Sequence, residues 1–105
     1  DFYYDRFGVK YYHDFKRHPY LEIPIVKNIK EKGKIYDVLS VGFFGKMEQA
    51  SIKINENGKG KIYLLPNELL GWALDAVAMS NMNMNAFPSE VEFGLLDGRY
   101  YAEVL

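Results

Sequence analysis

The fold is decided by the stretch KIYLLPNELLGWALDAVAMS, residues 61–80, in which the apolar period changes from two to about 3.6. Pro66 marks the change, because proline suits the first turn of a helix, where no backbone N–H is needed. The sequence therefore predicts a strand over Lys61 to Leu65 and a helix from Leu69 to about Ser80. In the strand we expect Ile62 and Leu64 to point inward, and Lys61 and Tyr63 outward.

The expected helix is apolar almost all round, with a polar edge at Glu68, Gly71 and Asp75 only. Such a helix is typically buried on more than one side. We therefore expect one side to cover a sheet and the other to meet a second subunit or the aromatic N-terminal segment. The residues expected at a dimer contact through the helix are Leu69, Trp72, Ala73 and Ala76.

Upstream of this junction, two more segments have strand patterns. Residues Ile35 to Phe44 are expected to form a long strand, with Ile35, Leu39, Val41 and Phe43 on one face and Tyr36, Val38, Ser40 and Phe44 on the other. Residues Gln49 to Asn55 alternate, which places Ala50, Ile52 and Ile54 inward. Asn57-Gly58 is a strong hairpin-turn signal, so three successive antiparallel strands are the natural interpretation.

The two ends of the chain also favour strands. Eight aromatic residues crowd the first twenty positions, which suggests strands and a hairpin around Phe7 to Val9. Pro24 limits the Tyr20 to Ile29 stretch to an edge or bulged strand. Residues 80–89 read as a loop, and Asp97-Gly98 predicts a C-terminal hairpin of Val91 to Leu96 with Arg99 to Leu105.

These patterns predict an α+β protein: a curved antiparallel sheet of four or more strands, one long buried helix and a C-terminal β-hairpin. The 105 residues fit a single domain. Within it we distinguish aromatic N-terminal strands (1–33), strands plus helix (34–80) and the C-terminal hairpin (90–105).

The net charge of −1 conceals a division between the two parts of the chain. Residues 1–65 carry twelve of the thirteen Lys and Arg and eight acids, a net charge of +4. Residues 66–105 carry only Arg99 and six acids, a net charge of −5. Such asymmetry is typical of a polyanion-binding face on an acidic body, although ordinary scatter of solvated charges explains it as well.

Composition also indicates the cellular compartment of the protein. The chain has no cysteine, which excludes disulfides and thiolate metal sites and fits a reducing compartment. No apolar stretch approaches the roughly 20 residues of a membrane span, and no signal peptide is visible. We expect a soluble cytoplasmic protein, in the host cytoplasm if the source is viral. The chain begins at Asp1 without Met, as a trimmed fragment would.

No arrangement of residues indicates catalysis. His13 and His18 lie near Asp14 but lack the further ligands that a metal site needs. The acids around the last hairpin lack the lysine that metal nucleases usually carry beside them, and no serine has the context of a nucleophile. We therefore expect no enzyme, no metal, no cofactor and no membrane contact.

Basic and aromatic residues alternate on the expected strands instead. If the alternation holds, one sheet face displays Tyr36, Phe44, Ser51, Lys53, Asn55, Lys61 and Tyr63, with Lys46 and Lys59 at the turns. Cations that follow a phosphate backbone and aromatic rings that stack on bases are the combination that binds single-stranded nucleic acid. The alternative is that the aromatics pack beneath the N-terminal segment and the lysines merely keep an edge soluble.

The strand-to-helix junction resembles that of the transcriptional coactivator positive cofactor four and its PUR and whirly relatives, which bind single-stranded DNA. The residues that fit are Ile62, Leu64, Pro66, Leu69 and Trp72, and the resemblance extends at most over residues 34–80. It implies a homodimer formed through the helices, with DNA on the sheet. The matching positions are core and helix positions, so they transfer no binding residue.

Two functional hypotheses remain. The first is a non-enzymatic homodimeric module that binds single-stranded DNA or RNA through Tyr36, Phe44, Lys46, Lys53, Lys59, Lys61 and Tyr63. The second is a protein-interaction or assembly module of viral or mobile-element type, whose apolar helix forms a subunit interface.

Overall fold

The computed structural model describes residues 2–4, 10–12, 18–45, 48–82, 84 and 86–105. A 3₁₀ turn, η2 (Asn67–Leu69), leads into the helix α1 (Leu70–Asn81). The strands are β1 (Phe2–Tyr4), β2 (Lys10–Tyr12), β3 (Ile25–Val26), β4 (Lys34–Phe44), β5 (Gln49–Glu56), β6 (Lys59–Leu64), β7 (Ser89–Leu96) and β8 (Arg99–Val104). The chain is α+β, as expected.

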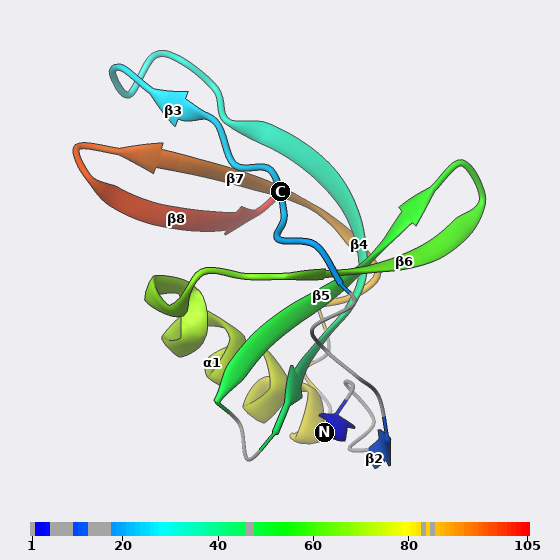
Figure 1. Ribbon diagram of the computed structural model, residues 1–105. Helices are drawn as coiled ribbons and strands as arrows, with labels where there is room; N and C mark the ends of the chain where they lie inside the picture. The colour runs from blue at the N-terminus through cyan, green and yellow to red at the C-terminus, as the bar shows by residue number, and fades with distance from the viewer. Residues whose placement is uncertain (1, 5–9, 13–17, 46–47, 83, 85) are drawn as a thin grey trace.

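Over the described residues the strands form one mixed sheet built around β4 (Figure 1). One edge of β4 pairs with β5, and β6 follows β5. The other edge pairs with β7 over Lys34 to Val38 and with β1 at Phe43 and Phe44. The pair β3–β7 is parallel, whereas the other strand pairs are antiparallel. The sheet is therefore rich in antiparallel pairs but not purely antiparallel.

The predicted hairpins are confirmed. Asn57 and Gly58 have φ values of 55° and 84°, and Asp97 and Gly98 have 52° and 74°. Positive φ at both central residues is what a two-residue hairpin turn between twisted strands requires. At the N-terminus β1 and β2 pair as a hairpin, and its expected turn at Phe7 to Val9 lies outside the described residues. The Tyr20 to Ile29 stretch contributes only the short strand β3.

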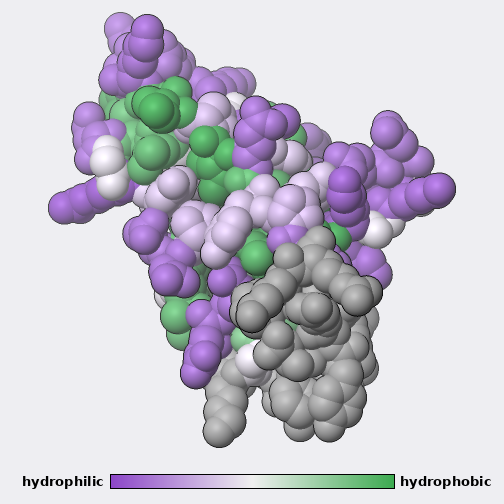
Figure 2. All heavy atoms as spheres, viewed as in Figure 1, coloured by the Kyte–Doolittle hydropathy of each residue, from purple (hydrophilic) through white to green (hydrophobic). Residues whose placement is uncertain are grey.

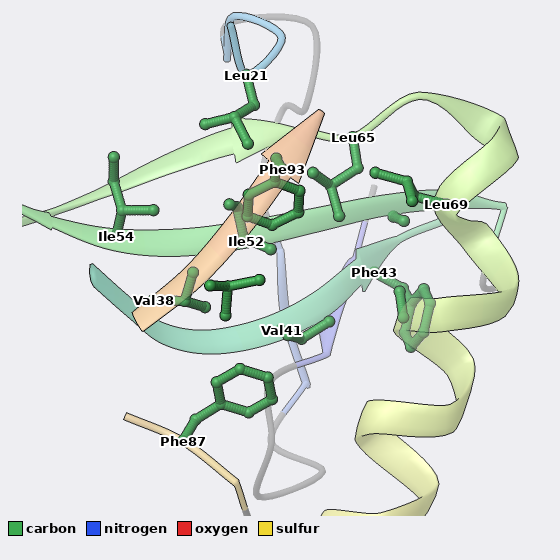
Figure 3. Close-up of a cluster of buried hydrophobic side chains, with 13 residues drawn as sticks. Leu21, Val38, Val41, Phe43, Ile52, Ile54, Leu65, Leu69, Phe87 and Phe93 are labelled. Carbon is green, nitrogen blue, oxygen red and sulfur yellow. The ribbon is translucent and has the colours of Figure 1, made fainter. Parts of the chain in front are cut away.

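The main core lies on the sheet face that α1 covers, which we call the helix face. Its labelled side chains in Figure 3 come from β4, β5 and β7, from the segments that flank the helix and, for Leu21, from the segment before β3. Ala50, Ile52 and Ile54 are buried there, as predicted. The edge-to-face contacts of Trp72 with Phe93 and Phe87 fasten the helix to β7 and to the segment before it.

We expected α1 to be buried on more than one side, whereas within the described residues only one side is covered. Ala73 is buried, but Gly71, Leu74, Asp75, Ala78 and Met79 are exposed. The sheet covers only one side of a helix, and within the described residues no second layer packs on the other side.

A bulge in β4 corrects the predicted faces of this strand. The register with β5 shifts between Val38 and Ser40, and one extra residue in a strand moves all later side chains to the opposite face. Tyr36 and Val38 therefore share the helix face with Val41 and Phe43. Ile35, which was expected beside Val41, is 41% exposed.

The predicted faces of β6 are also wrong. Directly opposed residues of an antiparallel pair lie on the same face, and Tyr63 is opposite Ile52 while Lys61 is opposite Ile54. Tyr63 therefore borders the main core. Ile62 and Leu64 point to the other face, which we call the outer face, where they pack with Phe44 in a second cluster.

Candidate nucleic-acid interface

Five basic and aromatic residues lie on the helix face, along the strands β4 and β6 that flank β5. We call this set the tyrosine–lysine strip: Lys34, Tyr36, Lys59, Lys61 and Tyr63. The first two lie on β4, opposite the buried Phe93 and Val91 of β7. The other three alternate along β6, and Lys59 begins it opposite Glu56. Four of the seven residues expected from the sequence are in this strip, and Lys34 is new.

In the β4 half of the strip, Tyr36 is held in place by its neighbours. Its ring makes an edge contact with Phe93, with centroids 6.0 Å apart, and its hydroxyl donates a 2.6 Å hydrogen bond to the Glu22 carbonyl oxygen. The Lys34 Nζ lies 5.2 Å from the ring centroid, within cation–π range. Burial raises the pKa of Tyr36, so the phenol is neutral near pH 7.

The β6 half repeats this arrangement. The Lys61 Nζ lies 5.3 Å from the centroid of the Tyr63 ring. The Tyr63 hydroxyl donates to the carboxylate oxygens of Glu56 at 3.1 and 3.2 Å. A side-chain hydrogen bond with Tyr63 raises the pKa of Lys61, and Glu56 raises it further, so this lysine is cationic near pH 7.

The two halves are close enough to interact electrostatically. A side-chain hydrogen bond with Tyr36 raises the pKa of Lys34, with contributions from Glu22 and from Tyr63. Tyr63 also contributes to the raised pKa of Tyr36. Tyr36 and Tyr63 also pack against the same core cluster, and exposed lysines lie beside both half-buried rings.

Two glutamates lower the positive charge of the strip. Glu22 lies 3.8 Å from the Lys34 Nζ, and Glu56 lies 3.6 Å from the Lys61 Nζ. Lys59 has no ion pair in the described part of the chain. Both pairs are solvent-exposed, and exposed ion pairs contribute little to stability. The tip of the β5–β6 hairpin, which projects from the sheet in Figure 1, is strongly hydrophilic (Figure 2).

Other expected binding residues lie elsewhere. Phe44 is 0% exposed and its ring stacks on that of His18, with centroids 5.5 Å apart. It cannot stack on a base in this structure. Lys53 is opposite Ile62 on the outer face, with its side chain over Gly60. Ser51, on the same face, is fully buried. The residues expected on one face of the sheet thus lie on two different faces. Lys46 lies outside the described residues.

The residues expected at the dimer contact differ in their burial. Leu69 and Ala73 are 3% and 0% exposed, because both belong to the main core of their own chain. They have no surface left for a second subunit. Trp72 and Ala76 are half-buried and line a hollow between α1, the segment before β7 and the end of β8.

A further polar cluster lies on the outer face. The Tyr101 hydroxyl donates a 2.7 Å hydrogen bond to a Glu92 oxygen, which also accepts the Gly33 N–H at 3.1 Å. The bond from Tyr101 and then that from Gly33 lower the pKa of Glu92. The Tyr101 ring lies over Gly94, its direct partner in the sheet. These contacts connect the β3–β4 segment to the C-terminal hairpin, which is a structural role.

Two absences apply to the described residues alone. Among them no three His, Asp or Glu side chains are grouped as metal ligands would be. No helix in this part of the chain has the length and apolar character needed to cross a membrane. The sequence was also compared with known proteins: no family model, curated protein or solved structure matches it.

Proposed function

We propose that this protein binds single-stranded DNA or RNA without catalysis, through the tyrosine–lysine strip. The observation that supports the proposal best is that Tyr36 and Tyr63 lie on one sheet face, each with a lysine ammonium within 5.3 Å of its ring centroid. Rings stack on bases for about 1–3 kcal/mol each with little sequence preference. Ammonium groups beside those rings meet the phosphates that connect stacked bases.

The proposed binding surface differs from the face expected from the sequence. It includes Lys34 and excludes Phe44 and Lys53, because the first of these two is buried and the second is on the outer face. The positive charge comes from three lysines and is partly cancelled by Glu22 and Glu56. We therefore expect weak, strongly salt-dependent binding rather than tight binding.

The resemblance of the strand-to-helix junction to the positive cofactor four type of module agrees with this proposal. In such a module the DNA lies on a curved sheet. We also propose that the sheet is curved, that the protein is cytoplasmic and that its source is a virus or a mobile element. We do not propose a homodimer through the helix, since Leu69 and Ala73 are buried in their own chain.

The test is a fluorescence-anisotropy titration of a labelled oligothymidine at several salt concentrations, with a duplex of the same length as control. Three phosphate-contacting lysines predict that log K falls with log salt with a slope of about −2 for a single strand. Preference for the single strand with this slope supports the proposal. No binding at low salt, or binding without salt dependence, contradicts it.

A further inference from the structure

An apolar hollow lies away from the tyrosine–lysine strip, at the C-terminal half of α1. Its volume is about 260 Å³. The apolar lining residues are Trp72, Ala76, Met79, Met84, Ala86, Phe87 and Val104. Met79 is 46% exposed and Met84 50%. Exposed apolar side chains that gather around a hollow mark an interaction surface more often than a plain solvent face.

The hollow has the size and lining of an anchor pocket. Its volume is below the roughly 300–1,000 Å³ of ordinary small-molecule sites and suits one large apolar side chain. Trp72 provides a rigid wall, because it is fixed by Phe87 and Phe93. Methionine side chains are flexible and adapt to different apolar partners. An anchor side chain in such a pocket supplies much of the energy of a protein interface.

The charge around the hollow indicates what kind of partner fits. Asp75 is the only charged residue among the described residues that line it. Over residues 66–105 the only basic residue is Arg99, which is in the turn at the opposite end of β8 from Val104. These two positions are five residues apart along the strand, a distance of about 16 Å. The described residues that line the hollow include no cation, and Asp75 gives them a negative charge.

From this charge pattern we infer that the hollow binds an amphipathic segment of another protein, with apolar residues on one face and lysine or arginine beside them. A second copy fits less well. In a two-fold dimer the same surface meets itself, and the described lining of this surface offers Asp75 no cation as a partner. Like charges across an interface cost binding energy, whereas a basic segment gains it.

The intrinsic fluorescence of Trp72 can report binding, since Trp72 is the only tryptophan of the chain and lines the hollow. The ligand is an 18-residue helical peptide of leucine and lysine with one apolar face. Two matched peptides serve as controls, one with glutamate in place of lysine and one with the same residues in scrambled order. We expect saturable change of the Trp72 emission with the leucine–lysine peptide only. Equal binding of the leucine–glutamate or the scrambled peptide overturns the inference.

Two pairs of variants make the test specific. Asp75→Lys should weaken binding of the leucine–lysine peptide by about fivefold or more, whereas Glu68→Lys, an equal charge change outside the lining, should not. Met79→Glu should abolish binding and Ile29→Glu should not; both sites are exposed, so both variants are expected to fold. Equal effects of Asp75→Lys and Glu68→Lys contradict the inference. Self-association that Met79→Glu removes would assign the hollow to a second copy and also overturn it.

Discussion

Glu56 bridges the two functional groups of the β6 half of the strip: its carboxylate lies 3.6 Å from the Lys61 Nζ and accepts a hydrogen bond of 3.1 Å from the Tyr63 hydroxyl. It is exposed and holds the lysine beside the ring. In the proposed function it competes with a phosphate for the same cation.

Replacing Glu56 with Gln should therefore increase the affinity for oligothymidine. The variant removes a negative charge that repels phosphate and frees Lys61 from an exposed ion pair. Such an exposed pair is weak, so we expect an increase in affinity of up to about fivefold at low salt. Glu103→Gln is the control, because it changes the net charge equally on the other face. If the two variants have the same affinity, the effect is one of net charge and not of the strip.

Tyr63 should act through its ring. Tyr63→Phe keeps the ring and loses the hydroxyl, so we expect oligothymidine affinity within about twofold of the original. Tyr63→Leu removes the stacking surface, which is worth about 1–3 kcal/mol, or about fivefold or more in affinity. Anisotropy titrations compare the two, and circular dichroism confirms the fold of each. A phenylalanine variant that loses as much affinity as the leucine variant would rule out stacking.

The Tyr101–Glu92 hydrogen bond should make stability depend on pH in the acid range. Its formation lowers the pKa of Glu92 below the ordinary value of 4.5. The contribution is therefore complete above that value and is lost as the pH falls through the lowered folded-state pKa. Tyr101→Phe should cost about 1 kcal/mol in the free energy of unfolding at pH 7, and less as the pH falls below 4. Tyr100→Phe is the control; urea unfolding with a constant difference from pH 7 to pH 3 would contradict the assignment.

Gly33 and Gly71 should respond to alanine in opposite directions. A Cβ at Gly33 would lie 2.1 Å from the Phe93 carbonyl oxygen, so Gly33→Ala must displace backbone and should destabilise the protein by more than about 1 kcal/mol. At Gly71, in α1, nothing lies within 4 Å of such an atom. Gly71→Ala should stabilise by up to about 1 kcal/mol. Thermal unfolding measures both, and a destabilised Gly71→Ala would indicate that another surface packs closely on the helix there.

The local elements were predictable because the signals for them are local. Alternation defined β5, the change of period at Pro66 defined the helix, and the two Asx-Gly pairs defined two hairpins. The β5–β6 register was in principle predictable too. A two-residue turn at Asn57 and Gly58 forces Ile54 opposite Lys61, and hence Lys53 onto the face away from Lys61. The error in the expected face came from assigning inward and outward positions to each strand separately.

Other features required tertiary information. The bulge after Val38 has no clear sequence signal, yet it decides that Tyr36 faces the helix side of the sheet. The insertion of β7 beside β4 gives Tyr36 its ring partner Phe93, which is 57 positions away along the chain. Lys34 was missed because the strand was expected to begin one residue later, at Ile35, although residues 34 and 36 share a face in any strand.

We propose above all that oligonucleotide binds the helix face of the β5–β6 hairpin and not the outer face. Lys61→Ala and Lys53→Ala make the same chemical change on the two faces of this hairpin. Their affinities for labelled oligothymidine at low salt are therefore the most direct measurement. The proposal predicts that Lys61→Ala weakens binding and lowers the salt slope by about 0.7, while Lys53→Ala leaves both nearly unchanged. Equal loss in the two variants, or a greater loss in Lys53→Ala, would contradict it.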